Sequence, residues 1–279
     1  MDLAKMRLDG KVAIVTGAAR GVGRACAVHF AREGAQLILI DVADNIDGVP
    51  YALGTRSQLD CTEELCRVEG VPAWSLQVDV RNLRAIHQAI EFTLDHCGRI
   101  DVLLNNAGIA APSGKAVHET TEAEWLLMLD IDLSGTWRMI HAAAKSMLEC
   151  KSGSIINISS TAGLVGYRNF AAYVAAKHGI IGLTRAAALD FAPLKVRVNA
   201  ICPGSIRDEA KYEGCMLGEI ARALSVPVSE HEETFVQGQP MNALIEPEDV
   251  ALAAVWLASD EARQVTGAVI AVDGGYSAR

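Results

Sequence analysis

The sequence has no excess of positive charge and no apolar run long enough to span a membrane. Its 34 aspartates and glutamates outnumber its 25 lysines and arginines, which gives a formal net charge of −9. Nucleic acids and anionic membranes attract a basic surface, so this acidic chain is not expected to bind either. The first residues also lack the apolar core of a signal peptide. We therefore predict a cytoplasmic protein that acts on a small molecule.

The sequence also lacks cysteine pairs and histidine clusters at the spacing of metal ligands. Its seven cysteines are scattered and include no Cys-x-x-Cys motif. A metal site or a disulfide framework is therefore not expected. Only Cys202, which precedes a Pro-Gly turn, stands where a cysteine could approach a ligand.

Apolar residues make up 51% of the chain and charged residues 21%, a composition typical of a globular protein with a large core. Apolar runs of strand length alternate with stretches of helical periodicity, a pattern that predicts a parallel sheet with helices on both faces. The expected strands are Val12–Thr16, Leu37–Asp41, Ala73–Val78, Val102–Asn105, Ser154–Ser159, Val196–Cys202 and Ala268–Val272. The expected helices are Gly21–Glu33, Gln58–Glu69, Leu83–His96, Glu122–Glu149, Ala171–Phe191 and Pro247–Ser259. We predict an α/β fold in which residues 1–279 form one domain around a doubly wound, seven-stranded parallel sheet of the Rossmann type.

Two segments are longer than simple strand-to-helix joints. Residues 42–57 form a turn-rich excursion after the second strand, and residues 205–245 form a mixed stretch after the sixth. Ligands of such sheets bind beyond the carboxyl ends of the strands, where both segments begin. We expect residues 205–245 to form a mobile apolar substrate lid, although their apolar side chains could instead pack only the lid's own short helices.

A glycine-rich turn joins the first expected strand to the first expected helix. Gly17, Gly21 and Gly23 follow the pattern G-x-x-x-G-x-G, which lets the chain turn tightly and lets backbone amides, including that of Val22, approach a pyrophosphate. The second strand ends in Asp41, whose carboxylate can accept hydrogen bonds from the adenosine ribose and would repel a 2′-phosphate. These features predict NAD as the cofactor.

Arg20 is the counter-evidence, because a basic residue beside the second glycine could pair with the 2′-phosphate of NADP. Asp41 would lie against that same phosphate, and neither Val42 nor Ala43 supplies a second cation. NAD therefore remains the prediction, with Arg20 as one of its contacts. Further contacts are expected at the ends of the third and fourth strands, from Asp79, Val80, Asn106, Ala107 and Gly108, although Asn and Gly are also common turn residues.

Tyr173 and Lys177 stand four residues apart in a helical stretch and therefore share one face. A phenol ordinarily has a pKa of about 10, and a lysine ammonium one turn away favours the phenolate and lowers that pKa. A base tuned toward neutral pH is what alcohol oxidation needs. Taken alone, the pair could also be an ordinary half-buried tyrosine and a surface lysine.

With these motifs in order, together with Ser159-Ser160, Cys202-Pro203-Gly204 and Val272-Asp273-Gly274-Gly275, the chain resembles the short-chain dehydrogenase/reductase family from Leu8 to Tyr276. The resemblance implies NAD(P)-dependent oxidation of an alcohol or reduction of a carbonyl. It implies that Tyr173 is the general acid/base, that Ser160 holds the substrate oxygen, and that Lys177 binds the nicotinamide ribose and lowers the pKa of Tyr173. It also places Asn106, Pro203, Gly204 and Ile206 near the cofactor.

Two residues depart from the family pattern. Asp132 takes the place of the asparagine whose main-chain carbonyl holds a relay water to the lysine in the family. A carboxylate there would stabilise the Lys177 ammonium and weaken its pull on Tyr173, so we include Asp132 among the expected catalytic residues. Asp208 stands where the family often has a threonine that touches the nicotinamide carboxamide, which puts that contact in doubt.

The excursion at residues 42–57 resembles the insertion of a branch of the family that works with the mycofactocin redox system, and of members that oxidise cyclic terpene alcohols. This likeness implies a hydrophobic cyclic alcohol or ketone as the substrate. Apolar residues beside the motifs are the expected pocket lining, namely Ile109, Leu164, Val165 and Phe170. They favour a compact hydrophobic secondary alcohol, such as a terpenoid, another alicyclic alcohol or a steroid-like alcohol, over a phosphorylated sugar. The family also implies a homotetramer.

Two other functions share many of these motifs. A 3-oxoacyl-[acyl-carrier-protein] reductase has the same core motifs, but it usually runs with NADPH and docks an acidic carrier on a basic patch, which fits neither Asp41 nor the net charge. A non-catalytic NAD-binding sensor or scaffold would have the fold without needing Ser160, Tyr173 and Lys177, all of which are present.

Overall fold

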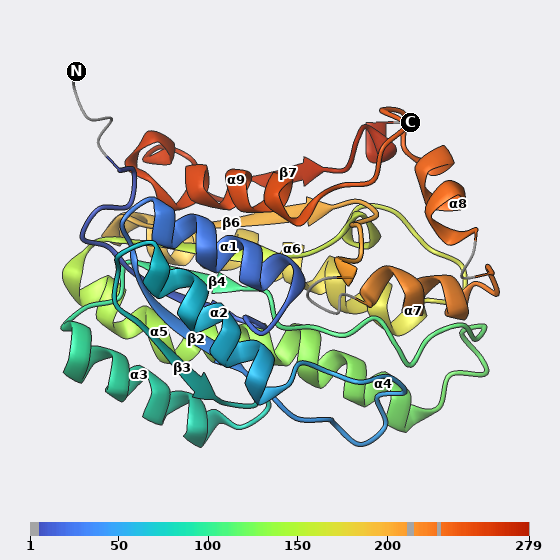
Figure 1. The fold of residues 1–279 in the computed structure, drawn as a ribbon, viewed down its shortest axis with the longest axis horizontal. Coiled ribbons are helices and arrows are strands. Elements are labelled where there is room, and N and C mark those ends of the chain that lie inside the picture. The colour runs from blue at the N-terminus through green and yellow to red at the C-terminus, as the bar shows by residue number, and fades with distance from the viewer. Residues whose placement is uncertain (1–5, 211–214, 228–229, 279) are drawn as a thin grey trace.

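The computed structural model describes residues 6–210, 215–227 and 230–278, and its centre is a seven-stranded parallel sheet (Figure 1). The strands are β1 (Val12–Thr16), β2 (Gln36–Asp41), β3 (Ala73–Gln77), β4 (Val102–Asn105), β5 (Gly153–Ile158), β6 (Val196–Pro203) and β7 (Val269–Val272). They lie in the order β3-β2-β1-β4-β5-β6-β7, and every neighbouring pair is parallel. The predicted Rossmann sheet is confirmed, and its strand order reverses direction between β1 and β4.

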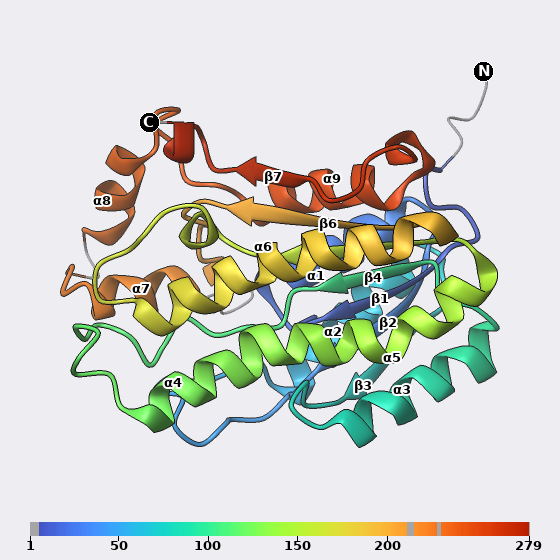
Figure 2. The same cartoon turned by 180° about the vertical axis from the view of Figure 1, so that it is seen from behind.

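Helices cover both faces of the sheet. One face carries α1 (Gly21–Arg32), α2 (Arg56–Val68) and α9 (Pro247–Ala258), as Figure 1 shows. The other face carries α3 (Leu83–Cys97), α5 (Gly135–Cys150) and α6 (Ala171–Phe191), as Figure 2 shows. Three further helices, α4 (Glu122–Met128), α7 (Met216–Ala223) and α8 (His231–Gly238), extend past the carboxyl ends of the strands.

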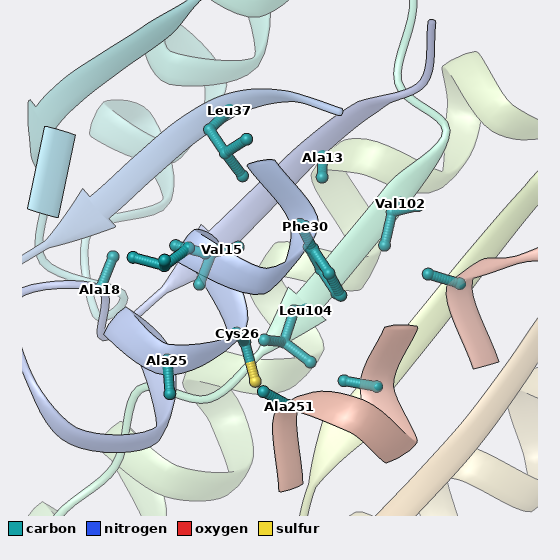
Figure 3. Close-up of a cluster of buried hydrophobic side chains, with 14 of the residues drawn as sticks. Ala13, Val15, Ala18, Ala25, Cys26, Phe30, Leu37, Val102, Leu104 and Ala251 are labelled. Atoms are coloured by element: carbon teal, nitrogen blue, oxygen red, sulfur yellow. The ribbon is translucent and has the colours of Figure 1, made fainter. Parts of the chain in front are cut away.

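Apolar side chains form a cluster between each face and its helices. The cluster beneath α1 and α9 is drawn in Figure 3, where Phe30 and Cys26 of α1 lie with Leu104 of β4. Phe30 is fully buried, and small residues such as Ala251 let α1 and α9 approach closely. The strands between the two clusters have apolar side chains on both sides, which is why their sequences are continuous apolar runs and not alternations of apolar and polar residues.

The predicted helical stretch Glu122–Glu149 is confirmed, but it is not α-helical throughout. A π-helical segment at Leu129–Ser134 separates α4 from α5. Within that segment the side chain of Asp132 is fully buried, and the Thr136 hydroxyl donates to the Asp132 carbonyl at 2.8 Å. A π segment inserts one residue without interrupting the helical run, so apolar periodicity does not reveal it. The other predicted elements differ from the observed ones by a few residues at their ends.

The excursion and the lid segment are both structured where the chain is described. Residues 42–55 form a loop that leaves the carboxyl end of β2 and leads to Arg56, the first residue of α2 (Figure 1). Within residues 205–245, α7 and α8 are the short helices expected there, and residues 211–214 and 228–229 lie outside the described part. In the described residues, no helix is long and apolar enough to cross a membrane.

We expect Phe30→Ala to lower the free energy of unfolding by about 3–5 kcal/mol, because the ring is fully buried and its removal leaves a cavity. Val68→Ala in α2 is the control, since Val68 is 74% exposed. Urea denaturation of both variants measures the difference. Equal midpoints for the two would contradict the packing described for α1.

Candidate active site

A cavity of about 640 Å³ opens at the carboxyl ends of the strands. Its walls come from the turns after β1, β2, β4, β5 and β6, from the excursion, from the start of α6 and from α7. These segments are far apart in the sequence and meet because parallel strands place their carboxyl ends along one edge. The site is therefore defined by the sheet and not by any one motif.

The glycine turn lies at one end of this cavity. Gly17 and Gly21 have left-handed backbones, with φ of +66° and +56°, and both line the cavity. Gly23 lies beneath the turn, where an added Cβ would stand 2.0 Å from the carbonyl oxygen of Gly17. Arg20 and Val22 also line the cavity. The turn thus has the tight geometry that the sequence pattern predicts.

Asn106 ties the turn after β4 to the glycine turn. Its side-chain amide donates to the carbonyl oxygens of Thr16 and Gly17, each at 3.1 Å. The backbone amides of Asn106 and Ala107 both donate to the Thr16 hydroxyl, at 2.9 and 3.1 Å. Asn106, Ala107 and Gly108 all line the cavity, so the cofactor residues predicted after β1 and β4 form one connected surface.

Asp41 is buried at the end of β2 and faces the cavity. Its carboxylate accepts from the backbone amides of Ala19 and Ala43, at 3.0 and 2.9 Å. Burial raises the pKa of Asp41, and these two hydrogen bonds oppose that rise. An added Cβ at Gly54 would lie 3.1 Å from the Asp41 carboxylate, so the excursion passes directly over it.

Arg20 and Asp79 make other contacts besides lining the cavity. The Arg20 guanidinium donates to the Ala52 carbonyl at 2.7 Å and so links the glycine turn to the excursion. Asp79 forms an ion pair with Arg81 at 2.6 Å, and Val80 lines the cavity beside it. Pro203, Gly204 and Ile206, predicted from the family resemblance, complete the opposite wall.

Ser160, Tyr173 and Lys177 lie together on the cavity wall. The Lys177 ammonium is 5.4 Å from the centre of the Tyr173 ring, and only 5% of Lys177 is exposed. Burial raises the pKa of Tyr173, whereas the Lys177 ammonium and a hydrogen bond from Ser160 oppose that rise. Ser159 does not have the role of Ser160. Its hydroxyl donates to the Lys177 carbonyl at 2.9 Å and holds the α6 backbone in place.

Asp132 lies behind this wall and does not line the cavity. It is fully buried, with one carboxylate oxygen 3.1 Å from the Lys177 ammonium. The other oxygen accepts from the Ile109 amide at 2.9 Å. Burial lowers the pKa of Lys177, but the Asp132 carboxylate and Tyr173 outweigh it, so the pKa of Lys177 is raised.

Apolar side chains line much of the cavity. Ile109 and Phe170 line it as predicted, whereas Leu164 and Val165 do not. The 3₁₀ turn before them (Thr161–Gly163) and Tyr167 after them line it instead. Helix α7 contributes three of its apolar side chains, Met216, Leu217 and Ile220. Asp208 also lines the cavity, and its carboxylate accepts from the Leu217 and Gly218 amides at 3.1 and 2.8 Å, which anchors the start of α7.

Sequence reasoning missed three tyrosines that line the cavity. Tyr167 and Tyr276 stack with ring centres 5.9 Å apart, and the Tyr167 hydroxyl lies 2.8 Å from that of Thr161. Tyr51 reaches in from the excursion, where its hydroxyl accepts from the Ala110 amide at 3.2 Å. The length of the excursion indicated that it lies near the ligand-binding edge of the sheet, but no local pattern distinguishes Tyr51 or Tyr276 from surface residues.

Comparison with known proteins shows which enzymes this chain is similar to. Residues 17–277 match the family described as Enoyl-(Acyl carrier protein) reductase. The (−)-trans-carveol dehydrogenase of Rhodococcus erythropolis is 37% identical over 274 residues, which cover 96% of this chain and 98% of that protein. The cis-4-hydroxycyclohexanecarboxylate dehydrogenase of Sinomonas cyclohexanicum is 37% identical over 268 residues, covering 96% and 97%. The 3-oxoacyl-[acyl-carrier-protein] reductase of Thermotoga maritima is 35% identical over 272 residues, covering 97% and 99%.

A solved structure of another carveol dehydrogenase is similar to this chain over nearly its whole length. The crystal structure of carveol dehydrogenase from Mycobacterium avium in complex with NAD superimposes with a TM-score of 0.91 at 33% identity, covering 98% of this chain and 99% of that one. The chain belongs to the short-chain dehydrogenase/reductase family. It is an oxidoreductase of that family.

We expect Gly23→Ala to lower the free energy of unfolding by about 1–3 kcal/mol, because its methyl group would overlap the Gly17 carbonyl. Gly182→Ala in α6 is the matched control, since no atom lies within 4 Å of its added Cβ. Guanidinium denaturation of both variants gives the comparison. A Gly23→Ala protein as stable as the control would show that the turn is looser than described.

Proposed function

We propose that the protein is an NAD-dependent dehydrogenase that interconverts a hydrophobic, alicyclic secondary alcohol and its ketone. The observation that carries the proposal is that one cavity contains both the glycine turn with Asp41 and the group of Ser160, Tyr173 and Lys177. The first set suits an adenine dinucleotide, and the second suits proton transfer at an alcohol oxygen. Their common cavity lets both act on one substrate.

The residues around the glycine turn fit NAD. Gly21 has open space where a Cβ would stand, so a pyrophosphate can approach the backbone at the start of α1. A Cβ added at Gly17 would stand 2.9 Å from the Cα of Ala107, so the missing side chain lets the glycine turn pack against Ala107. Asp41 would accept hydrogen bonds from the two ribose hydroxyls, while Asn106 holds the neighbouring turn in place. When bound, NAD supplies the redox chemistry as acceptor or donor of a hydride.

The protein's own residues move the proton. In alcohol oxidation, Tyr173 as phenolate takes the hydroxyl proton, and the Ser160 hydroxyl donates a hydrogen bond to the same substrate oxygen. The Lys177 ammonium stabilises the phenolate through its charge. In carbonyl reduction, Tyr173 as phenol returns a proton to that oxygen. The apolar wall from α7 excludes water from the reacting atoms.

The lining of the cavity supports the substrate class. Many apolar and aromatic side chains line it, including Ile109, Phe170, Ile220 and the stacked Tyr167–Tyr276 pair. Such walls favour a compact hydrophobic ring over a phosphorylated sugar. Two relatives named as dehydrogenases of carveol and of cis-4-hydroxycyclohexanecarboxylate support a terpenoid or other alicyclic alcohol.

Other parts of the proposal rest on the sequence pattern and, for the oligomeric state, on the family likeness. We propose that residues 205–245 act as a substrate lid, that the enzyme is a cytoplasmic homotetramer and that all residues belong to one catalytic domain. Size-exclusion chromatography with light scattering tests the tetramer. A monomer at micromolar concentration would exclude it.

A second candidate function is 3-oxoacyl-[acyl-carrier-protein] reductase, which two relatives at 35% identity favour. The buried carboxylate of Asp41 opposes NADPH, and the net charge of −9 opposes an acidic carrier protein. A silent NAD-binding scaffold is opposed by the gathering of Ser160, Tyr173 and Lys177. Turnover of acetoacetyl carrier protein with NADPH that exceeds turnover of every cyclic ketone with NADH would favour the reductase.

We expect Ser160→Ala to reduce kcat/KM on the best cyclic secondary alcohol of a panel by about 10²–10³-fold, because it removes the donor to the reacting oxygen. Ser159→Ala is the matched control and should retain most activity, since its hydroxyl bonds the Lys177 backbone and not the substrate. Steady-state rates of NADH formation give both values. Equal losses in the two variants would refute the assignment of Ser160.

We expect Asp41→Asn to raise the ratio of kcat/KM with NADP to that with NAD by roughly tenfold, about 1.4 kcal/mol, because it removes the charge that repels a 2′-phosphate. Asp44→Asn, in the exposed part of the excursion, is the charge-matched control. Assays with each cofactor at equal concentration measure the ratio. An unchanged ratio in Asp41→Asn would show that another residue selects the cofactor.

A further inference from the structure

Asp132 and Lys177 form an ion pair inside the protein. Asp132 is fully buried, Lys177 is 5% exposed, and their charged atoms are 3.1 Å apart. Within the described chain, the carboxylate oxygen that faces the ammonium has no polar partner besides Lys177, while the other oxygen is held by the Ile109 amide. A buried carboxylate with one oxygen supported only by an ammonium is costly unless that ammonium stays charged.

The space around the pair fixes its position. A Cβ added at Gly108 would stand 3.0 Å from the Asp132 carboxylate and 3.3 Å from the Lys177 ammonium. Gly108 in the turn after β4 therefore leaves just enough room for the two groups. On the other side, the hydrogen bond from Thr136 to the Asp132 carbonyl holds the π-helical segment that carries the carboxylate.

The other titratable groups that face this pair are neutral near pH 7. Cys202 of β6 faces Tyr173 and Lys177, Tyr167 faces Tyr173, and Tyr51 of the excursion faces Asp132. Burial raises the pKa of each of these three groups, which keeps them protonated. In the described residues around Tyr173, the charges that act on it at close range are therefore those of Lys177 and Asp132.

We propose that Asp132 is a positioning residue whose carboxylate offsets the charge of Lys177 and thereby moves the pH range in which Tyr173 exchanges its proton to higher pH. The inference rests on the proposed function, in which Tyr173 is the group that exchanges the proton. Asp132 itself touches neither the cavity nor the reacting atoms.

The direction follows from the charge of the buried cluster. With phenol, ammonium and carboxylate present, the cluster is neutral, and loss of the Tyr173 proton leaves one uncompensated negative charge. With an uncharged residue at position 132, the cluster begins with one positive charge, and the same loss leaves it neutral. A buried site disfavours an uncompensated charge, so Tyr173 loses its proton at a higher pH when the Asp132 carboxylate is present than when residue 132 is uncharged.

The charges near Tyr173 agree with this direction. Burial raises the pKa of Tyr173, Lys177 lowers it, and Asp132 raises it again by opposing Lys177. Burial and Asp132 thus favour the protonated form of Tyr173, which is the form that carbonyl reduction needs. Alcohol oxidation needs the phenolate and should be fastest at alkaline pH.

The test replaces the carboxylate by an amide of the same shape. In Asp132→Asn saturated with NAD, we expect the acidic limb of the pH profile of kcat/KM for alcohol oxidation to move to lower pH by about one unit or more. Asp130→Asn is the matched control, because it removes a carboxylate from the same π-helical segment. The Asp130 carboxylate pairs with Arg138 and not with Lys177. Its profile should coincide with that of the wild type.

A second readout needs no substrate and separates this inference from the proposed function. The ultraviolet absorbance of the Tyr173 phenolate is obtained as the difference between each protein and its Tyr173→Phe counterpart during a pH titration with NAD bound. We expect the phenolate to form at lower pH in Asp132→Asn than in the wild type. Asp132→Ser, which is smaller and uncharged, provides the same comparison if the asparagine variant does not fold.

Phenolate formation at the wild-type pH or higher in the uncharged variants overturns the role of Asp132. The proposed function would survive that result if Tyr173→Phe still abolished turnover. Conversely, a shifted phenolate titration together with full activity of Tyr173→Phe would preserve the electrostatic coupling and remove Tyr173 from catalysis.

Discussion

Because all the strands of the sheet run in one direction, their carboxyl ends meet along one edge, and the chain must turn there after each strand. The strand order also reverses between β1 and β4, so the turns after these two strands diverge to opposite faces and leave a crevice. Asn106 joins the two turns through hydrogen bonds to Thr16 and Gly17. The cavity, and every group that faces it, depends on this arrangement of parallel strands.

The same constraint explains how a charged group is tolerated inside the protein. Lys177 comes from α6, Asp132 from the π-helical segment and Gly108 from the turn after β4, and these elements converge behind the cavity wall. Ser159 at the end of β5 holds the backbone of Lys177 from the other side. A buried ammonium stays charged only with a partner nearby. The fold therefore fixes the electrostatic setting of Tyr173 as well as its position.

Much of the fold could be predicted from the sequence because buried parallel strands read as continuous apolar runs, such as Val12–Thr16, followed by helical periodicity. The glycine turn, Asp41 and the Tyr173–Lys177 pair were predictable for a similar reason, since each depends on local spacing. The contact between Asp132 and Lys177 was anticipated only through the family resemblance, and the structure brings the two charges to 3.1 Å.

What the sequence could not predict depends on contacts between distant segments. The π-helical segment preserves helical periodicity, so the apolar pattern predicts one long helix and does not reveal the segment. Leu164 and Val165 looked like pocket residues because they follow the serines, but the 3₁₀ turn before them and Tyr167 after them line the cavity instead. Tyr276 reaches the cavity from the end of the chain and stacks on Tyr167, a contact that no local pattern encodes.

The most direct test of the central claim is transfer of deuterium from the carbinol carbon of labelled cyclic secondary alcohols to NAD, followed by mass spectrometry of the cofactor. The account predicts singly deuterated NADH with the wild type and none with Tyr173→Phe. Absence of deuterated NADH with every alcohol of the panel, or equal amounts from both proteins, would contradict it.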